Sequence, residues 1–314
     1  MNKMKKLLYI SIIGLILTAC SSESKIDENI EGKSRRDIEG NSIDGCEGDG
    51  TDLTQIIFSN RSLTFTEGGT RITKISDLQG NARSTFNYTN NKLASAHVIT
   101  FNKDINFSFE YQNDKLSRIS KTINGNTIVT DLEYSGNHII VHDPNEPPGL
   151  YKMRLTFDTD NRIVSMEEMV FLSNKWVRNL DSFRFAATGL YSVARSFDAY
   201  NPATGTFYDI GVSGNSSNFS FHEDVRSPIQ NAMEPFRIAA YFEPDLMYNL
   251  SLSDHARYAL FEMNYLSLFR FATSGTSYRY TQEVDCTNEQ KHPLLGRILS
   301  KYGDLFSDTT FIYE

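Results

Sequence analysis

The fold of this chain is decided by residues 105–119, which read INFSFEYQNDKLSRI. Apolar and polar residues alternate over 105–111, and this period of two is typical of a β-strand with one buried face. Asn113 and Asp114 follow, two residues of the types that accept the positive φ angles of a tight turn. The next apolar position is Leu116, two residues after Asp114. The stretch therefore predicts two antiparallel strands joined by a hairpin turn.

The same pattern recurs along the chain. A triplet of an apolar residue, any residue and an aromatic residue repeats every 23 residues, with its aromatic at Phe65, Tyr88, Tyr111, Tyr134 and Phe157. Looser copies follow at 183–185, 219–221, 278–280 and 311–313. Turn residues fall between the strands at Asn90-Asn91, Asn113-Asp114, Asn124-Gly125, Ser135-Gly136-Asn137, Pro147-Pro148-Gly149 and Asp160-Asn161. This repetition predicts an all-β chain, an antiparallel meander of repeated hairpins that forms a curled sheet or open barrel.

Residues 226–272 interrupt the repeat. Ser227-Pro228 is typical of a helix start, and apolar residues follow at helical spacing, at Ala232, Met233, Phe236, Ala239 and Ala240. Ser253 is the N-cap of a second candidate helix that reaches Met263. We therefore expect one or two short helices to be inserted near the C-terminus, where they would plug or cap the curved sheet.

The triplet, its polar turn and the aliphatic residue after it, as in 109–119, resemble the YD repeats of Rhs-like proteins. They are also similar to the repeats of uncharacterised exported bacterial lipoproteins with a porin-like meander. The resemblance covers about residues 60–225 and, more loosely, 275–314. The Asp that follows the Tyr in YD repeats is kept here only at Asp158. The resemblance implies a fold and no particular activity.

The composition argues against two classes of binding partner. Aromatic residues make up 12% and the formal net charge is −8. A nucleic-acid-binding domain carries a basic stripe, and a peripheral membrane protein often carries a polybasic patch. Neither is expected in an acidic chain, so we predict no nucleic-acid partner.

The N-terminus reads as an export signal. Lys3, Lys5 and Lys6 precede an apolar run over 7–17, which as a helix would rise about 16 Å against a hydrocarbon core of about 30 Å. Leu17-Thr18-Ala19-Cys20 resembles the lipobox of bacterial lipoproteins, which implies removal of residues 1–19 and acylation (palmitate or a similar chain) of Cys20. An ordinary secretory leader with a chance cysteine is the alternative.

Residues 20–50 are predicted to be a disordered acidic linker behind the anchor. Within 21–50 the chain has nine acidic and four basic residues and no aromatic residue. Ser21 and Ser22 resemble signals for the outer membrane, whereas Lys25-Ile26-Asp27-Glu28 only weakly resembles motifs for the cell surface. The periplasmic and cell-surface faces both stay open. Residues 51–314 are expected to form a single β-repeat domain with the helical insertion at 226–272.

The remaining two cysteines, Cys46 and Cys286, are a candidate disulfide pair, because export places them in an oxidising compartment. Two separate thiols are the equal alternative. Neither has a cysteine or histidine nearby at zinc-ligand spacing, which disfavours a metal site.

The sequence contains few candidate clusters of catalytic or metal-binding residues, and each has a simpler explanation. His138 and His142 lie four apart, which on a strand separates them by about 13 Å. His222-Glu223-Asp224 is better explained as a solvated strand end, and 158–161 as a turn rather than a calcium loop. No hydrolase elbow, phosphate loop, dinucleotide fingerprint or zinc-protease motif is present. We therefore predict no catalytic, cofactor-binding or metal-binding residues.

These observations favour a lipid-anchored protein of the outer membrane that acts as a non-enzymatic binding or structural module, with a glycan, lipid or envelope protein as partner. The alternative is a half-barrel carrier whose aromatic face holds a lipid or another apolar ligand. A membrane-embedded barrel is disfavoured because strands such as 115–123 carry charge on both faces. A hydrolase with paired carboxylates is the remaining class.

Overall fold

The computed structural model describes residues 52–58, 60–142, 150–187, 189–250, 256–273, 276–287, 291, 293–299 and 305–313. Residues 46–314 form one compact unit. Its strands are β1 Leu53–Phe58, β2 Arg61–Phe65, β3 Ile72–Asp77, β4 Ala82–Thr89, β5 Lys92–Ile99, β6 Asp104–Gln112, β7 Lys115–Ile123, β8 Asn126–Asp131, β9 Glu133–Ser135, β10 His138–Val141, β11 Met153–Phe157, β12 Ile163–Leu172, β13 Lys175–Ala186, β14 Gly189–Asn201, β15 Thr206–Arg226, β16 Asn264–Thr273, β17 Thr276–Thr287, β18 Pro293–Leu299 and β19 Leu305–Tyr313. Its helices are η1 Glu67–Gly69, α2 Gln230–Met233, η2 Glu234–Phe236, α3 Arg237–Phe242, η3 Pro244–Met247 and η4 Ala256–Phe261, where η marks a 3-10 helix.

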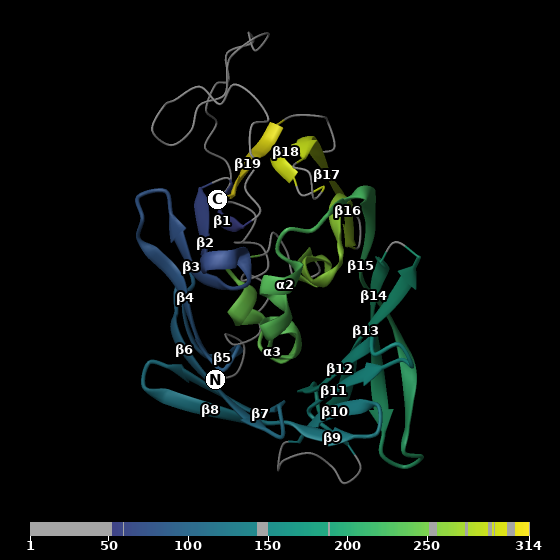
Figure 1. The fold of residues 1–314 in the computed structure, drawn as a ribbon. Coiled ribbons are helices and arrows are strands. Elements are labelled where there is room, and N and C mark those ends of the chain that lie inside the picture. Colours follow the sequence, from purple (N-terminus) through teal and green to yellow (C-terminus); the bar gives the residue numbers. More distant parts are fainter. Residues whose placement is uncertain are drawn as a thin grey trace, which may run out of the picture. The chain divides into compact units, whose positions relative to one another are not determined.

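The strands form one antiparallel, nearly closed sheet (Figure 1). Each strand pairs with its neighbours along the chain, and β1 pairs with both β2 and β19. The exception is at Leu132, where β8 and β9 follow each other without pairing. β8 pairs with β7, and β9 pairs with β10. The predicted all-β meander is confirmed, and the β1–β19 pairing brings its two ends together as in a barrel.

The repeat has a structural cause. At Phe65, Tyr88, Tyr111, Phe157 and Phe185 the strand register shifts immediately before the aromatic residue. A β-bulge of this kind bends the strand and increases its twist. The repeat therefore bends the sheet once per hairpin, which is how a meander curls.

The predicted turns carry the expected backbone. Asn90 and Asn91 have φ angles of 50° and 64°, and Asn113 and Asp114 have 49° and 65°. Two consecutive residues with positive φ make the turn that matches the twist of a two-residue hairpin. Pro147-Pro148-Gly149 lies outside the described residues.

The predicted alternation holds in β6, where Ile105, Phe107 and Phe109 are buried. It was wrong at Tyr151, which we expected on the same face as Met153. The Lys152 amide donates to the Val141 carbonyl (2.8 Å), and Met153 also pairs with Val141. Two residues opposite one form a bulge, so Tyr151 packs in a second small cluster with Leu150 and Met169 instead.

Residues 229–250 and 256–261, called the helical segment below, lie inside the curved sheet (Figure 1). The five residues predicted at helical spacing are at most 1% exposed: Ala232, Met233, Phe236, Ala239 and Ala240. They pack in one core with apolar residues of strands from β1 to β19. The second predicted helix is the 3-10 helix η4, and residues 264–273 form strand β16, so the helical segment ends earlier than the expected position 272.

Polar contacts hold this segment to the sheet wall. The Lys121 ammonium of β7 donates to Glu243 (2.9 Å) and Asp245 (2.7 Å). The buried Asn249 amide donates to the hydroxyl of Ser84 in β4 (2.9 Å). Because these partners lie on different strands, they fix both the height and the rotation of the segment inside the sheet.

Within the described part of the chain, no helix has the length and apolar character needed to cross a bilayer. The predicted signal peptide, Cys20 and the predicted linker lie outside that part.

Candidate functional site: an apolar cavity beside the helical segment

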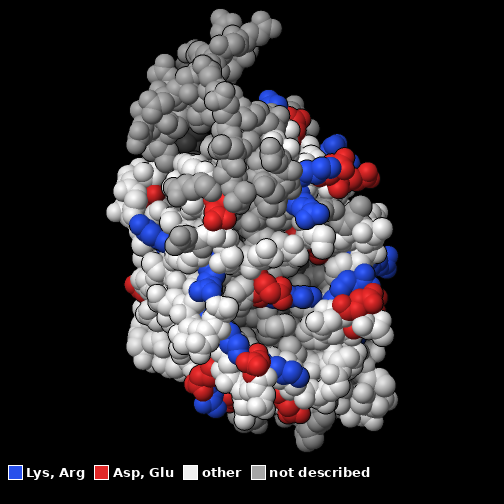
Figure 2. Space-filling model, in the orientation of Figure 1, with Lys and Arg blue, Asp and Glu red and all other residues white. Residues whose placement is uncertain are grey.

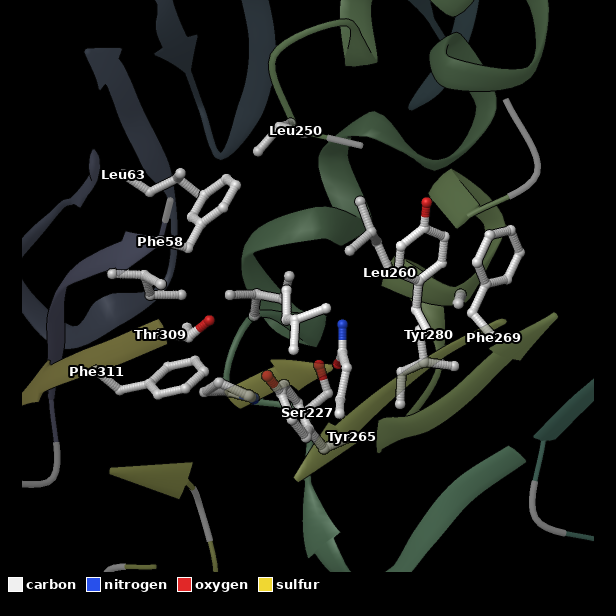
Figure 3. Close-up of a pocket in the computed structure, with 17 residues that line it drawn as sticks. Phe58, Leu63, Ser227, Leu250, Leu260, Tyr265, Phe269, Tyr280, Thr309 and Phe311 are labelled. Atoms are coloured by element: carbon white, nitrogen blue, oxygen red, sulfur yellow. The ribbon is translucent and has the colours of Figure 1, made fainter. Parts of the chain in front are cut away.

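A cavity of about 130 Å³ lies between the helical segment and the last strands of the sheet. Its wall comes from strands β1, β2 and β16–β19, from residues 227–229 at the start of the helical segment, and from Leu250 and η4 near its end. The lining residues are Ile56, Phe58, Leu63, Ser227, Pro228, Ile229, Leu250, Ala259, Leu260, Tyr265, Leu266, Phe269, Tyr280, Gln282, Ile298, Thr309 and Phe311. Figure 3 shows the aromatic and aliphatic side chains that line the pocket, with Leu250 and Leu260 contributed by the helical segment.

Four lining side chains carry uncharged polar groups: Ser227, Tyr265, Gln282 and Thr309. Among the described residues, none of these four side chains has a hydrogen-bond partner. The one contact recorded at Gln282 uses its backbone carbonyl, 3.0 Å from His222 Nε2. An apolar pocket with a few converging polar groups is the usual form of a small-molecule site.

The cavity is electrically neutral. No Asp, Glu, Lys or Arg is among the residues that line it. Burial raises the pKa of the Tyr265 phenol above its ordinary value, so this hydroxyl stays protonated and can donate a hydrogen bond. The site can therefore accommodate an apolar group and offer hydrogen bonds to it, and it has no charge with which to hold an ion.

The repeat aromatics, by contrast, are mostly satisfied core residues. The hydroxyls of Tyr88, Tyr111 and Tyr134 donate to backbone carbonyls of the preceding hairpin at 2.8, 3.0 and 2.9 Å. Burial, with the neighbouring Tyr134, raises the pKa of Tyr111 to about 12. A cation covers each ring in turn, as Lys92 covers Tyr111 at 5.2 Å from the ring centre. These rings stabilise the rim of the sheet and are not an open stacking platform.

Charged side chains on the surface are mixed in sign. Figure 2 shows Lys and Arg interspersed with Asp and Glu on the visible face. On the side of the sheet away from the core, Glu167 is 3% exposed and is held by Arg154, Arg178 and Tyr151. This network supports the second cluster and leaves no cation there without a carboxylate partner.

The sequence clusters form no metal site. No group of three metal-ligating side chains occurs in the residues that the structure describes. His138 contacts the Thr156 hydroxyl (3.1 Å), and His142 lies 3.7 Å from Glu133. Asp158 accepts the amides of Asp160 and Arg162, both at 2.9 Å, and so caps a turn as predicted. Cys20 and Cys46 lie outside the description, as does the side chain of Cys286, whose backbone belongs to β17.

Sequence reasoning missed the cavity residues. Ser227 was read only as a helix start, and Tyr265, Gln282 and Thr309 lie on three different strands. Their one common signal is that they fall after residue 226, where the 23-residue spacing has ended.

No model of a known protein family matches the chain, and no curated protein matches it. Among solved structures it is similar to a porin-like protein from Bacteroides vulgatus, with 10% identity over 84% of this chain and 99% of that one, at a TM-score of 0.33. It is also similar to a porin-like protein from Bacteroides uniformis, with 9% identity over 69% and 93%, at a TM-score of 0.23. A third similarity, to a Tc holotoxin pore from Photorhabdus luminescens, has 13% identity, covers 78% of this chain and 14% of that one, and has a TM-score of 0.24.

Proposed function

We propose that this protein is a lipid-anchored, non-enzymatic binding module of the bacterial cell envelope, and that its cavity takes a neutral, largely apolar group. The observation that carries the proposal is the set of four uncharged polar side chains in an apolar wall, none of which has a hydrogen-bond partner among the described residues. The anchor rests on the sequence from Leu17 to Cys20.

The size of the cavity limits the ligand. An apolar cavity of about 150 Å³ in another protein stays dry and binds benzene. The 130 Å³ here suits a group of that size, such as one ring or a short acyl segment. Because the helical segment packs against strands from β1 to β19 in one core, the wide half-barrel carrier of the sequence analysis is reduced to separate small pockets, of which this one is apolar.

The chemistry of the wall limits the ligand further. A carboxylate or ammonium moved into this site would lose its hydration without gaining a counter-charge, which costs several kcal/mol or more. A hydroxyl, ester or amide would instead pair with Tyr265, Gln282 or Ser227. The expected ligand therefore has an apolar body and an uncharged polar end.

Benzyl alcohol and benzoate test this, since they share a ring and differ in charge. The protein for the test is residues 20–314 carrying Cys20→Ser, which includes the whole compact unit with its own sheet and core. Benzyl alcohol should raise the melting temperature and benzoate should not. Ala259→Leu, which fills the cavity, should abolish the effect, whereas Phe101→Ala at an exposed position (94%) should not. Equal effects of the two compounds, or binding that survives Ala259→Leu, would contradict the proposal.

The anchor has its own test. The full chain expressed in a bacterium should incorporate a clickable palmitate analogue and fractionate with membranes, and Cys20→Ser should lose the label. Labelling that persists in Cys20→Ser, or no labelling of the unchanged chain, would remove the anchor and leave the cavity proposal standing.

A further inference from the structure

A second pocket, of about 370 Å³, opens on a different part of the sheet interior. It lies between α3–η3 of the helical segment and the inner face of β7, β8 and β11–β14. Its residues are Lys121, Ile128, Thr130, Lys152, Met153, Met166, Glu168, Asn179, Asp181, Arg195, Phe242, Glu243 and Pro244. Unlike the apolar cavity, this pocket is lined by charged groups of both signs.

Part of this charge is already neutralised within the wall. Lys121 is held by Glu243 and Asp245. Arg195 makes two hydrogen bonds to Asp181, at 2.7 and 2.8 Å, and Asp181 also lies 3.3 Å from the Tyr258 hydroxyl. These pairs shape the pocket.

Three side chains in the pocket remain unpaired. Within the described part of the chain, neither the half-buried Lys152 ammonium nor the half-buried Glu168 carboxylate makes a direct ion pair or hydrogen bond, although Lys152 is near enough to Glu243 to lower the pKa of that carboxyl. Asn179 Oδ1 is shielded from solvent and accepts no hydrogen bond. Opposite charges that are partly buried without partners are costly, and so is a buried acceptor without a donor.

The backbone brings the three together. Glu168 of β12 pairs directly across from Asn179 of β13, and Met153 of β11 pairs across from Glu168. Residues directly opposite in antiparallel strands have Cβ atoms about 5 Å apart on one face. Lys152 precedes Met153, and the bulge opposite Val141 places both in the pocket wall. A cation, an anion and an amide therefore border one space.

We propose that this pocket binds a small α-ammonium carboxylate, such as a free amino acid. Its carboxylate pairs with Lys152, and its ammonium donates to Glu168. An anion or a cation alone would satisfy one charge and leave the other unpaired, and a neutral sugar would compensate neither. A zwitterion compensates both charges at once, and 370 Å³ lies in the size range of small-molecule pockets.

The test uses residues 20–314 carrying Cys20→Ser and an equimolar mixture of the proteinogenic L-amino acids. Ligand-observed NMR should identify at least one that binds. For that amino acid, both the N-acetyl derivative, which lacks the ammonium, and the carboxamide, which lacks the carboxylate, should bind the unchanged protein about tenfold or more weakly. This comparison needs no substitution, so it does not depend on how a variant folds.

Variants then assign the groups. Lys152→Met should weaken binding of the amino acid about tenfold or more and remove the preference for it over its carboxamide. Glu168→Gln should remove the preference over the N-acetyl derivative. Lys175→Met, at an exposed position in β13, is the matched control and should change nothing. Benzyl alcohol binding should be unaffected by all three, which separates this site from the apolar cavity. No binding of any amino acid, or binding that both pocket variants leave unchanged, would overturn the proposal.

Discussion

The two ends of the helical segment meet the sheet in different ways. Most apolar side chains from Ala232 to Met247 are buried against the sheet, and Phe236 packs edge-on to Phe86 at a ring separation of 4.9 Å. Leu250, Ala259 and Leu260 face strands β16–β19 and leave a cavity of about 130 Å³. The difference follows the repeat. Phe236 packs directly against a ring from a strand that keeps the 23-residue spacing, whereas the apolar cavity lies beside β16–β19, where that spacing is lost; the polar second pocket lies elsewhere, at Phe242–Pro244.

The largest expected effect is at the packed end. Phe236→Ala removes a fully buried ring and should lower the free energy of unfolding by about 3–5 kcal/mol, because the rigid strands around it cannot close the hole. Urea denaturation measures this. Phe101→Ala, at an exposed site, should change stability by less than about 0.5 kcal/mol. Similar losses for the two variants would mean that the segment is not packed as described.

A larger side chain should affect stability differently at the two ends of the helical segment. Ala240 is 1% exposed at the packed end, and Ala240→Leu should cost about 1–3 kcal/mol through overpacking. Ala259→Leu adds the same atoms beside the cavity and should cost less than about 1 kcal/mol, or stabilise. Equal destabilisation, measured by urea denaturation, would show that the cavity is already occupied by the protein's own atoms.

Removing a hydroxyl gives a smaller contrast. Tyr111→Phe deletes a hydrogen bond to the Leu93 carbonyl and should cost about 0.5–1.5 kcal/mol. Tyr265→Phe deletes a hydroxyl that has no partner among the described residues. It should leave the free energy of unfolding unchanged and weaken the binding of benzyl alcohol. A stability loss in Tyr265→Phe would reveal a partner for that hydroxyl and count against its role in binding.

The smallest effect concerns Glu243, which together with Lys121 ties the packed end to β7. Burial raises the pKa of Glu243 above its ordinary value of 4.5, even though Lys121 and its hydrogen bond lower it. A raised pKa favours the protonated form in the folded state, so this group's contribution is fully present below about pH 4.5 and is lost as the pH rises through the folded value. Glu243→Gln should therefore gain stability relative to the unchanged protein between about pH 4.5 and 7, by less than about 1 kcal/mol. Denaturation at several pH values measures the difference. If the free energy of unfolding of Glu243→Gln instead falls relative to the unchanged protein as the pH rises, the attraction of Lys121 outweighs the effect of burial.

Much of the fold could be predicted because its signals are local. The alternation over 105–111, the paired turn residues at 90–91 and 113–114, and the helical spacing from Ala232 to Ala240 each depend on residues close in sequence. Tyr151 was placed on the wrong face because a bulge depends on how Lys152 and Met153 meet Val141 on another strand. No pattern within one strand reports that pairing.

The sites were not predictable for the same reason. The side chains of the apolar cavity come from residues as distant in sequence as Ile56 and Phe311, and those of the second pocket range from Lys121 of β7 to Pro244 of the helical segment. A site residue is recognised in sequence only if its neighbours in space are also its neighbours in the chain, as in a phosphate loop. In a closed meander, facing residues are separated by many hairpins.

The sequence by itself determined the strands, the turns and the inserted helical segment, because backbone alternation and turn chemistry act within a few residues. Only the tertiary structure decided that β1 pairs with β19, that the helical segment lies inside the sheet, and where pockets remain beside it. Closure and packing depend on the summed bends of many hairpins and on the volumes that meet inside them. These are properties of the whole sheet, and no single repeat contains them.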